Sequence, residues 1–336
     1  MFPRSAGFVS ALFLVVGAAL NFQPAFAQSN GPLEVADTVS PEATRELKAA
    51  YELRSAPPSP DRAAALAARS RDLIARLGVT LVDDQIGGVK VVRIRPVKAR
   101  ATGWTLLYLH GGGYVAGSTQ ALIYLPALIA DRTGAEVISI EYTLAPQADW
   151  RGITTEVVSV WRGLLVKGMD ARAAAIFGDS AGGGLAAGVA LRLRDEGVAL
   201  PAALYLVSPW SDISGSGDTD ATLAASDPIL DPTTLKTAAA MYAKPADQRL
   251  AYVSPVYGDY SRDFPPTLIQ CGTREMFVSN CVREYQAIRA GDHEAVLDMY
   301  EGMPHAFPAL APDSPETNTA IARAAAFFEA HFRNPG

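Results

Sequence analysis

The sequence predicts an α/β fold in which a mostly parallel central sheet is flanked by helices. Six short runs after residue 100 are almost wholly apolar, and helical stretches separate them along the chain. Strands buried on both faces have this composition when helices cover a parallel sheet on its two sides. The runs are WTLLYLH, AEVISIEY, AAIFGD, AALYLVSP, PTLIQCG and AVLDMYE. A length of 336 residues is enough for one large domain of this kind or for two small ones.

Composition and charge narrow the class of protein. The chain is 49% hydrophobic and 19% charged, which is ordinary for a globular protein with a large core. Its formal net charge of −6 argues against nucleic acid or an anionic membrane surface as a partner, because both attract basic surfaces.

The N-terminal residues have the three parts of a secretory signal peptide. Arg4 supplies a positive charge, an apolar stretch covers about residues 8–20, and Ala25-Phe26-Ala27 forms an A-x-A cleavage site. The apolar stretch is short for a membrane span. We therefore expect residues 1–27 to be cleaved and the protein to be exported, either to the periplasm or out of the cell. The alternative is an uncleaved or lipid-associated anchor.

An exported chain can hold disulfides, and this chain has two cysteines, Cys271 and Cys281. Cys271 lies in an expected strand and Cys281 in an expected helix. Burial of both as small apolar residues is favoured over a bridge, which stays open. Neither has a histidine or a second cysteine at the spacing of metal ligands, so we expect no metal site.

Two helices precede the sheet in the segment 28–78. After a linker, Ser40-Pro41-Glu42 and Ser59-Pro60-Asp61 each have the composition of a helix start. Serine caps free amides, proline suits the first turn, and an acid suits the positive end of the helix dipole. Gly78 is expected to end the second helix.

Strand patterns begin at Val79, and residues 79–336 are expected to form the main domain. VTLVDD and VKVVRIRP predict a hairpin around Gly87-Gly88. Residues 211–250 combine loop residues with a helical stretch after Asp231-Pro232. Their length indicates an insertion rather than an ordinary crossover.

A serine between glycines follows the run AAIF, and Gly178-Asp179-Ser180-Ala181-Gly182 matches the pattern G-x-S-x-G. The turn from strand to helix is so tight that a Cβ at either glycine would clash, and it exposes the Ser180 hydroxyl at the carboxyl end of the sheet. The helix start adds amides and positive potential that suit an anion. A glycine-rich crossover turn is the alternative. A dinucleotide site is disfavoured because the spacing G-x-G-x-x-G is not met and no acid ends the next strand.

The run WTLLYLH leads into a glycine loop that favours the nucleophile. Acyl transfer requires two or three donors that stabilise an oxyanion, and His110-Gly111-Gly112-Gly113 offers such amides. HGGG together with G-x-S-x-G occurs in lipases and esterases. The expected donors are the N–H groups of Gly112, Gly113 and Ala181. A glycine turn with a structural histidine is the alternative.

Four histidines are candidates for the general base. His305, in YEGMPHAF, follows the last apolar run, and a loop at the carboxyl end of a strand can reach Ser180. His110 belongs to the glycine loop, His331 lies in the terminal helix, and His293 lies at a helix end on the wrong edge of the sheet. His305 is therefore the expected base, with a structural histidine as the alternative.

The acid should fall between Ser180 and His305 in the chain. PTLIQCGTREMF ends a strand and delivers Glu275, whose carboxylate would accept the imidazole N–H and fix its tautomer. Asp292 and Asp298 are rivals, but the first adjoins another histidine and the second lies inside a strand. The order serine, acid, histidine is that of α/β-hydrolases.

Six motifs, in order, resemble those of the bacterial hormone-sensitive-lipase-like esterases, a branch of the α/β-hydrolase fold. They are HGGGYVAGS, IEYTLAP, FGDSAGG, LVSPWSDIS, SPVYGD…FPPTLIQCG and GMPHAF. The resemblance extends from about Val79 to the C-terminus. It implies an α/β-hydrolase fold with a helical cap, formed by the N-terminal helices and the insertion after Trp210. It also implies hydrolysis of short- or medium-chain carboxylic esters without metal or cofactor, and it supports Glu275, since part of the family has glutamate there.

The chain departs from the family pattern at two places. Where the family usually reads D-Y-R-L-A-P-E, this chain reads EYTLAPQ, so that Thr143 and Gln147 replace an arginine and a glutamate that brace the oxyanion loop. After Glu275 the family often has paired aspartates, and here Ser279 and Asn280 stand instead. These changes concern the bracing of the site rather than the triad.

We therefore expect an ester hydrolase in which Ser180 attacks, His305 transfers the proton and Glu275 orients His305. Its partner would be a small-molecule ester. The alternative is a non-catalytic small-molecule-binding module on the same fold, which would keep the pocket and lose a member of the triad. The sequence leaves open the acyl chain length, a preference for lactones or amides, and the oligomeric state.

Overall fold

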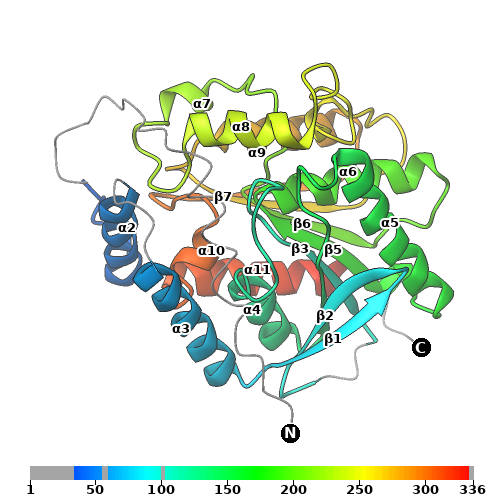
Figure 1. Cartoon of the computed structure of the whole chain (residues 1–336), viewed down its shortest axis with the longest axis horizontal. Coiled ribbons are helices and arrows are strands. Elements are labelled where there is room, and N and C mark those ends of the chain that lie inside the picture. Colours follow the sequence, from blue (N-terminus) through cyan, green and yellow to red (C-terminus); the bar gives the residue numbers. More distant parts are fainter. Residues whose placement is uncertain (1–33, 55–59, 100–102, 333–336) are drawn as a thin grey trace, which may run out of the picture.

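The computed structural model describes residues 34–54, 60–99 and 103–332. Within them lies a sheet with the strand order β1-β2-β4-β3-β5-β6-β7-β8 (Figure 1). β1 pairs with β2 and β2 with β4 in antiparallel fashion, and all the other neighbours are parallel. The predicted α/β class, with its mostly parallel sheet, is confirmed. The predicted signal peptide lies outside the described residues.

The strands are β1 (Thr80–Ile86), β2 (Val89–Arg95), β3 (Thr105–Leu109), β4 (Glu136–Ile140), β5 (Ala174–Asp179), β6 (Ala203–Val207), β7 (Thr267–Gly272) and β8 (Ala295–Tyr300). The α-helices are α2 (Pro41–Arg54), α3 (Pro60–Leu77), α4 (Tyr124–Thr133), α5 (Trp150–Val166), α6 (Ala181–Asp195), α7 (Thr219–Thr222), α8 (Pro232–Tyr242), α9 (Val278–Ala290), α10 (Phe307–Leu310) and α11 (Pro315–His331). Short 3-10 helices cover Ala171–Ala173 and Pro255–Tyr257.

Successive residues of a strand point to opposite sides of the sheet, and here the side chains on both sides are apolar. Helices therefore cover both faces of the sheet. Leu107 and Ile176 belong to the core shared with α5, α6 and α9, whereas Leu106 and Phe177 belong to the core shared with α3, α4 and α11. β5, β6 and β7 are buried along their whole length. Two apolar layers therefore hold the central strands, and with them the loops at their carboxyl ends.

Both N-terminal helices begin where the sequence predicts, and the second also ends there. α2 begins at Pro41, and the hydroxyl of Ser40 accepts a hydrogen bond from the N–H of Ala43 at 3.1 Å, as a helix cap does. α3 begins at Pro60 and stops before Gly78, whose φ of +65° suits a glycine. The hairpin of β1 and β2 turns at residues 87–88, as expected.

One strand differs from the prediction. β8 was expected to be buried on both faces, yet Val296 and Met299 are 41% and 38% exposed. Among the described strands, β8 is the last in the sheet and β7 is its one partner. Helices therefore do not cover it completely, although its composition is apolar.

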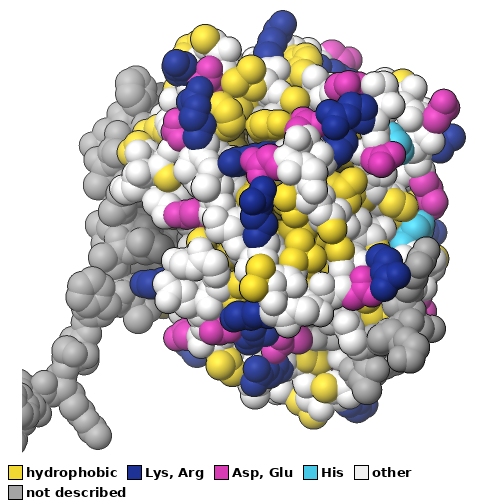
Figure 2. Space-filling view, turned by 90° about the vertical axis from the view of Figure 1, so that its right-hand side faces the viewer, with side chains coloured by type: hydrophobic (Ala, Val, Ile, Leu, Met, Phe, Trp, Pro, Cys, Tyr) yellow, Lys and Arg dark blue, Asp and Glu magenta, His cyan; other side chains and the backbone are white. Residues whose placement is uncertain are grey.

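The insertion 211–250 contains α7 and α8, and α8 lies across the top of the molecule in Figure 1, above the sheet. Figure 2 shows another face, on which basic and acidic side chains are interspersed rather than gathered by sign. Among the described helices, none combines the length and the apolar character that a membrane span needs.

Candidate active site

Ser180 lies on a sharp turn between β5 and α6, with φ +55° and ψ −124°. Its backbone is held on both sides, because its N–H donates to Val207 at 2.8 Å and its carbonyl accepts from Trp210 at 2.8 Å. A Cβ added to Gly182 would lie 1.9 Å from the carbonyl oxygen of Leu109, which no structure tolerates. The glycine pattern around the serine thus reflects a real steric limit, and the left-handed φ of Ser180 marks a strained position of the kind found at functional sites.

Three backbone amides near this turn have no hydrogen-bond acceptor among the described residues. They are the N–H groups of Gly112, Gly113 and Ala181, and Ala181 is the first residue of α6. The first amides of a helix have no partner within the helix, and they carry positive potential. Gly112 and Gly113 adopt φ angles of +105° and +63°, which turn the loop and which only glycine adopts readily. The three amides are thus available to an anionic oxygen.

Asp179, the residue before Ser180, braces the loop that carries Gly112. One carboxylate oxygen of Asp179 accepts hydrogen bonds from the hydroxyl of Tyr108 at 2.5 Å and from the N–H of Gly111 at 3.2 Å. Asp179 is buried, and burial raises its pKa. The residue before the serine therefore holds the glycine loop and the turn together.

The segment 141–147 braces the same loop although Thr143 and Gln147 depart from the family pattern. The hydroxyl of Tyr142 donates to the carbonyl of His110 at 2.8 Å, and its ring stacks on the His110 ring with centroids 4.2 Å apart. The carboxylate of Glu141 accepts from the N–H of Thr119 at 2.6 Å. Thr143 instead points to Glu156, with which it makes two hydrogen bonds of 2.7 Å. Bracing is therefore present, but other residues supply it.

Glu275 and His305 form a buried pair. Oε2 of Glu275 lies 2.8 Å from Nδ1 of His305, and the side chains are 0% and 4% exposed. Burial opposes a charge on the imidazole, but the carboxylate outweighs this effect and raises the pKa of His305. With Nδ1–H donating to the carboxylate, Nε2 is free to accept a proton.

Ser180 follows β5 and His305 follows β8, so both lie at the carboxyl ends of parallel strands. No hydrogen bond joins the Ser180 hydroxyl to His305 among the described residues. In enzymes without bound substrate such bonds are often long, and they shorten when substrate binds. The structure thus joins Glu275 to His305 directly and brings Ser180 to the same edge of the sheet.

The rival residues have other partners. His293 contacts the carbonyl of Arg262 at 2.8 Å, and His331 contacts the carbonyl of Phe327 at 2.8 Å and the carboxylate of Glu294 at 3.1 Å. Asp298 accepts hydrogen bonds from Gln270 and Tyr300. None of these groups lies against His305.

Two residues that the sequence did not single out hold the acid. Ser208, directly after β6, donates its hydroxyl to Oε1 of Glu275 at 2.9 Å. Asp227, from the insertion, accepts from the N–H of Met276 at 2.8 Å and contributes to the raised pKa of His305. Both are 0% exposed. A serine and an aspartate in loops of one sequence carry no signal of such a role.

Cys271 and Cys281 are both buried free thiols, as the sequence favoured. Their sulfur atoms and a carboxylate oxygen of Glu275 lie within 4.8 Å of one another. Burial raises the pKa of the Cys281 thiol, which disfavours the thiolate that metals bind. Glu275 is also occupied, since it accepts from His305, Ser208 and the N–H of Gly272.

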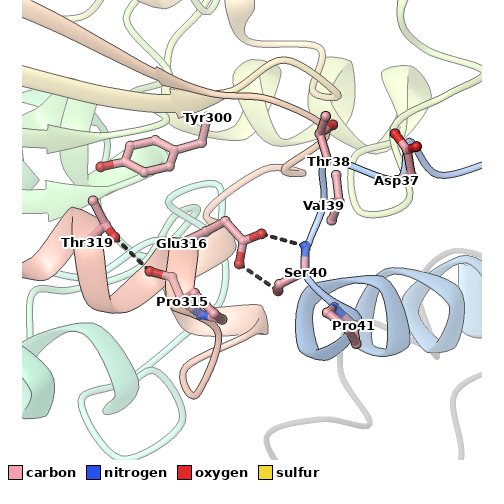
Figure 3. A pocket seen from close by; sticks show the side chains of 9 residues that line it. All are labelled: Asp37, Thr38, Val39, Ser40, Pro41, Tyr300, Pro315, Glu316 and Thr319. Atoms are coloured by element: carbon pink, nitrogen blue, oxygen red, sulfur yellow. Dashed lines mark hydrogen bonds between the residues drawn. The ribbon is translucent and has the colours of Figure 1, made fainter.

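The segment before α2 packs on the loop that precedes His305. Val39 reaches so close to Gly302 that a Cβ there would lie 2.5 Å from its methyl group. Met303 and Phe307, on either side of His305, are fully buried in a small core with residues of α2 and α11. Figure 3 shows how this segment is fastened: the N–H and hydroxyl of Ser40 both donate to the carboxylate of Glu316, at 2.8 and 2.7 Å.

Comparisons with known proteins identify the family of the chain. A family model described as the alpha/beta hydrolase fold matches residues 106–309. The chain is 37% identical to LipR of Mycobacterium tuberculosis, over 73% of this chain and 79% of LipR. It is 34% identical to an acetyl-hydrolase of Streptomyces hygroscopicus, over 77% of this chain and 86% of that protein. The crystal structure of an esterase from the bacterial hormone-sensitive lipase family superposes with a TM-score of 0.78 at 31% identity, covering 89% of this chain and all of that one.

Proposed function

The chain belongs to the bacterial hormone-sensitive-lipase-like esterases of the alpha/beta hydrolase fold, and from this premise we propose that Ser180, His305 and Glu275 form its catalytic triad. The coarser function follows from the family: the protein is a serine carboxylesterase-like hydrolase that acts on carboxylic esters. The observation that carries the proposal is the buried hydrogen bond between Glu275 and His305, at the same edge of the sheet as the Ser180 turn.

In the proposed mechanism, Oγ of Ser180 attacks the ester carbonyl while Nε2 of His305 takes the hydroxyl proton. Glu275 keeps the Nδ1–H of His305 in place and stabilises the imidazolium that forms. His305 then gives the proton to the departing alcohol, which leaves an acyl-enzyme. A water molecule repeats the sequence on this ester and releases the acid. Every step uses groups of the chain and water.

The tetrahedral oxyanion would be bound by the N–H groups of Gly112, Gly113 and Ala181. Their lack of other acceptors among the described residues supports this role, because donors that are already in place need no reorganisation during the reaction. Loss of one such donor typically costs about 3 kcal/mol of transition-state stabilisation.

We propose esters of short- to medium-chain acids as substrates. The names acetyl-hydrolase and acetyl esterase among the relatives support the short end of this range. Helix α8 also lies close to the oxyanion loop, since a Cβ on Gly113 would be 3.4 Å from that of Ala238. Rates measured on p-nitrophenyl esters of increasing chain length would test this range. Faster turnover of long-chain than of short-chain esters would contradict it.

The proposed cap consists of residues 28–78 and the insertion 211–250, on a catalytic domain of residues 79–336. Arg54, at the end of α2, supports a joint unit because its guanidinium donates to the carbonyls of Ala224 and Ala225 at 2.7 and 3.1 Å. The cap would cover Ser180, which is only 9% exposed.

The triad is tested by Ser180→Ala with p-nitrophenyl butyrate as the substrate. We expect kcat to fall by at least about 10⁴-fold, while the fold is unchanged by circular dichroism. Ser211→Ala is the matched control, because Ser211 is another buried serine, whose hydroxyl donates to the carbonyl of Asn280. A fluorophosphonate probe should label Ser180 in the unaltered protein and not in Ser180→Ala. Unchanged hydrolysis by Ser180→Ala would refute the triad, and failure to label the unaltered protein would favour a non-catalytic binding module.

We also propose that the protein is exported after cleavage behind Ala27. The support is the signal pattern of residues 1–27. Expression in a bacterial host followed by N-terminal sequencing of the periplasmic protein should give Gln28 as the first residue. An intact N-terminus on cytoplasmic protein would contradict export.

A further inference from the structure

Ser208 lies at the carboxyl end of β6, between the strand that leads to Ser180 and the strand that leads to Glu275. It is 0% exposed, and its hydroxyl has two partners. The hydroxyl donates to Oε1 of Glu275 at 2.9 Å and accepts from the N–H of Ala306 at 3.0 Å. Ala306 is the residue after His305, so one oxygen atom contacts both the proposed acid and the backbone next to the proposed base.

The position of this hydroxyl is fixed by the sheet. The N–H of Ser208 donates to the carbonyl of Gln270 in β7 at 2.7 Å, which continues the pairing of the two strands beyond Val207. Four neighbouring parallel strands, β5 to β8, thus lead in turn to Ser180, Ser208, Glu275 and His305.

Backbone conformation at both ends of the contact is unusual. Ser208 has φ +46° and Ala306 has φ +51°, both in the left-handed region that favours glycine. A serine at such a position costs conformational energy, which a glycine would avoid. A serine differs from a glycine at this position by its hydroxyl, which makes both contacts.

We propose that Ser208 is a positioning residue, which fixes the Glu275 carboxylate and the His305 loop relative to each other. This inference rests on the proposed triad. The carboxylate has one oxygen for His305, and its other oxygen is held by the Ser208 hydroxyl and by the N–H of Gly272 at 2.8 Å. With Oε1 held in this way, the carboxylate cannot turn away from the imidazole. The bond from Ala306 sets the distance between the two loops.

A purely structural role is the competing explanation, because a buried hydroxyl also satisfies polar groups that would otherwise lack partners. The two explanations predict different results. A structural hydroxyl affects the free energy of unfolding alone. A positioning hydroxyl affects the turnover step and the titration of His305, because both depend on how Glu275 faces the ring.

The test uses Ser208→Gly and Ser208→Ala, with Ser211→Ala as the control. Glycine suits the left-handed φ of position 208, so Ser208→Gly removes the hydroxyl with little effect on the backbone. We expect kcat for p-nitrophenyl butyrate to fall roughly 10- to 100-fold, which is the scale of a small misplacement in a catalytic site, with KM within about twofold. Ser211→Ala should lower the melting temperature and leave kcat unchanged.

The pH dependence gives a second readout. When Glu275 is held less firmly it raises the pKa of His305 less, so the acid limb of kcat/KM should move to lower pH in both Ser208 variants. Burial, which lowers the pKa of His305, and the charges of Asp227 and Asp179, which raise it, are unchanged in these variants, so the shift reports the contact with Glu275. The rate of fluorophosphonate labelling at Ser180 should show the same shift.

The outcomes separate this inference from the triad itself. If Glu275→Gln abolishes turnover while both Ser208 variants keep the kcat and pH profile of the unaltered protein, the positioning role is wrong and the triad stands. If Glu275→Gln retains full activity, the triad fails and this inference fails with it. In a Glu275→Gln background, Ser208→Gly should change kcat by less than about twofold, because its proposed route of action is already removed. A further 10-fold loss there would overturn the inference.

Discussion

Oε2 of Glu275 lies 2.8 Å from Nδ1 of His305 at a depth where neither side chain has appreciable contact with solvent. The ring is thereby held with its other nitrogen free, and its affinity for a proton is increased by the carboxylate. A general base works only while it is neutral, so under the proposed mechanism this pair of residues would set the lower pH limit of activity.

We expect kcat/KM to fall as the pH drops through the raised pKa of His305, at a pH above the ordinary histidine value of about 6.5. In Glu275→Gln the rate should fall about 10³- to 10⁴-fold, and the acid limb of the remaining activity should move to lower pH. Steady-state rates on p-nitrophenyl butyrate between pH 5 and 9, as an experimental range, would show both effects. An acid limb that stays in place in Glu275→Gln would mean that another carboxylate perturbs the ring.

Glu284 in α9 should make stability depend on pH. Burial raises its pKa to about 8, and one of its oxygens has no partner among the described residues. The hydroxyl of Tyr260 contacts both Oε1 of Glu284 and the carbonyl of Pro255. A phenol has one hydrogen and a carbonyl only accepts, so a protonated Glu284 must donate to Tyr260.

Because the folded state keeps this proton to a higher pH than the unfolded state, the free energy of unfolding should fall as the pH rises from about 4.5 through about 8. Glu284→Gln keeps a neutral side chain at every pH and should remove a loss of roughly 3–5 kcal/mol over this window. Urea unfolding at several pH values would measure it, with the exposed Glu52→Gln as the control. Equal slopes in Glu284→Gln and in the unaltered protein would show that Glu284 is already charged when folded.

Gly182→Ala should prevent the nucleophile turn from closing. Its Cβ would lie 1.9 Å from the carbonyl of Leu109, so β3 and α6 would have to separate. We expect loss of more than about 100-fold in kcat, since a shift of about 1 Å in a catalytic site has this effect. The control is Gly152→Ala in α5, where the Cβ would meet only the side chain of Ala148 at 3.1 Å. Normal rates in Gly182→Ala would show that the loop adapts more than its packing suggests.

Tyr142→Phe should weaken the proposed oxyanion loop, residues 110–113, without removing any of its backbone amides. The variant loses the hydrogen bond to the carbonyl of His110 and keeps the stacked ring. We expect roughly a 10-fold fall in kcat, less than the 100-fold or so that follows loss of a donor itself. Tyr205→Phe is the matched control, because Tyr205 is equally buried and donates to Gln270. Each variant should cost about 1 kcal/mol of stability, and equal kcat values in the two would argue against the brace.

Features that depend on a short stretch of chain could be predicted from the sequence. The hairpin at residues 87–88, the helix starts at Pro41 and Pro60, and the strand before Ser180 follow from local patterns of glycine, proline and apolar residues. The turn at Ser180 could also be predicted, because its glycines form a short sequence pattern, although the atom that Gly182 avoids, the carbonyl oxygen of Leu109, belongs to the neighbouring strand β3. The α/β class follows because parallel strands buried on both faces have a composition that few other structures share.

Contacts between distant segments could not be predicted in this way. Ser208 meets Glu275 across 67 residues of sequence, and Asp227 meets Met276 across 49. LVSPWSDIS resembles a family motif, but serine and aspartate are common in loops, so neither it nor ASDPIL reveals which distant residues Ser208 and Asp227 contact. β8 shows the converse, since its apolar residues resemble those of a central strand although it lies at the edge of the sheet. The exposure of a strand residue depends on the elements that pack against the strand, and the sequence of the strand alone does not reveal these elements.

The two hydrogen bonds from Ser40 to Glu316 join the start of α2 to α11, and this contact has a consequence for the order of folding. The first described helix packs in a small core whose other members come from residues 300–320. That helix reaches its partners only after nearly the whole polypeptide has left the ribosome. Until then the apolar side chains of Val39, Ala43 and Leu47 lack the residues that bury them in the folded protein. A chaperone can bind such exposed apolar side chains in an unfinished chain. This core can therefore form only after residues 300–320 have been synthesised, and it includes Met303, from the loop before His305.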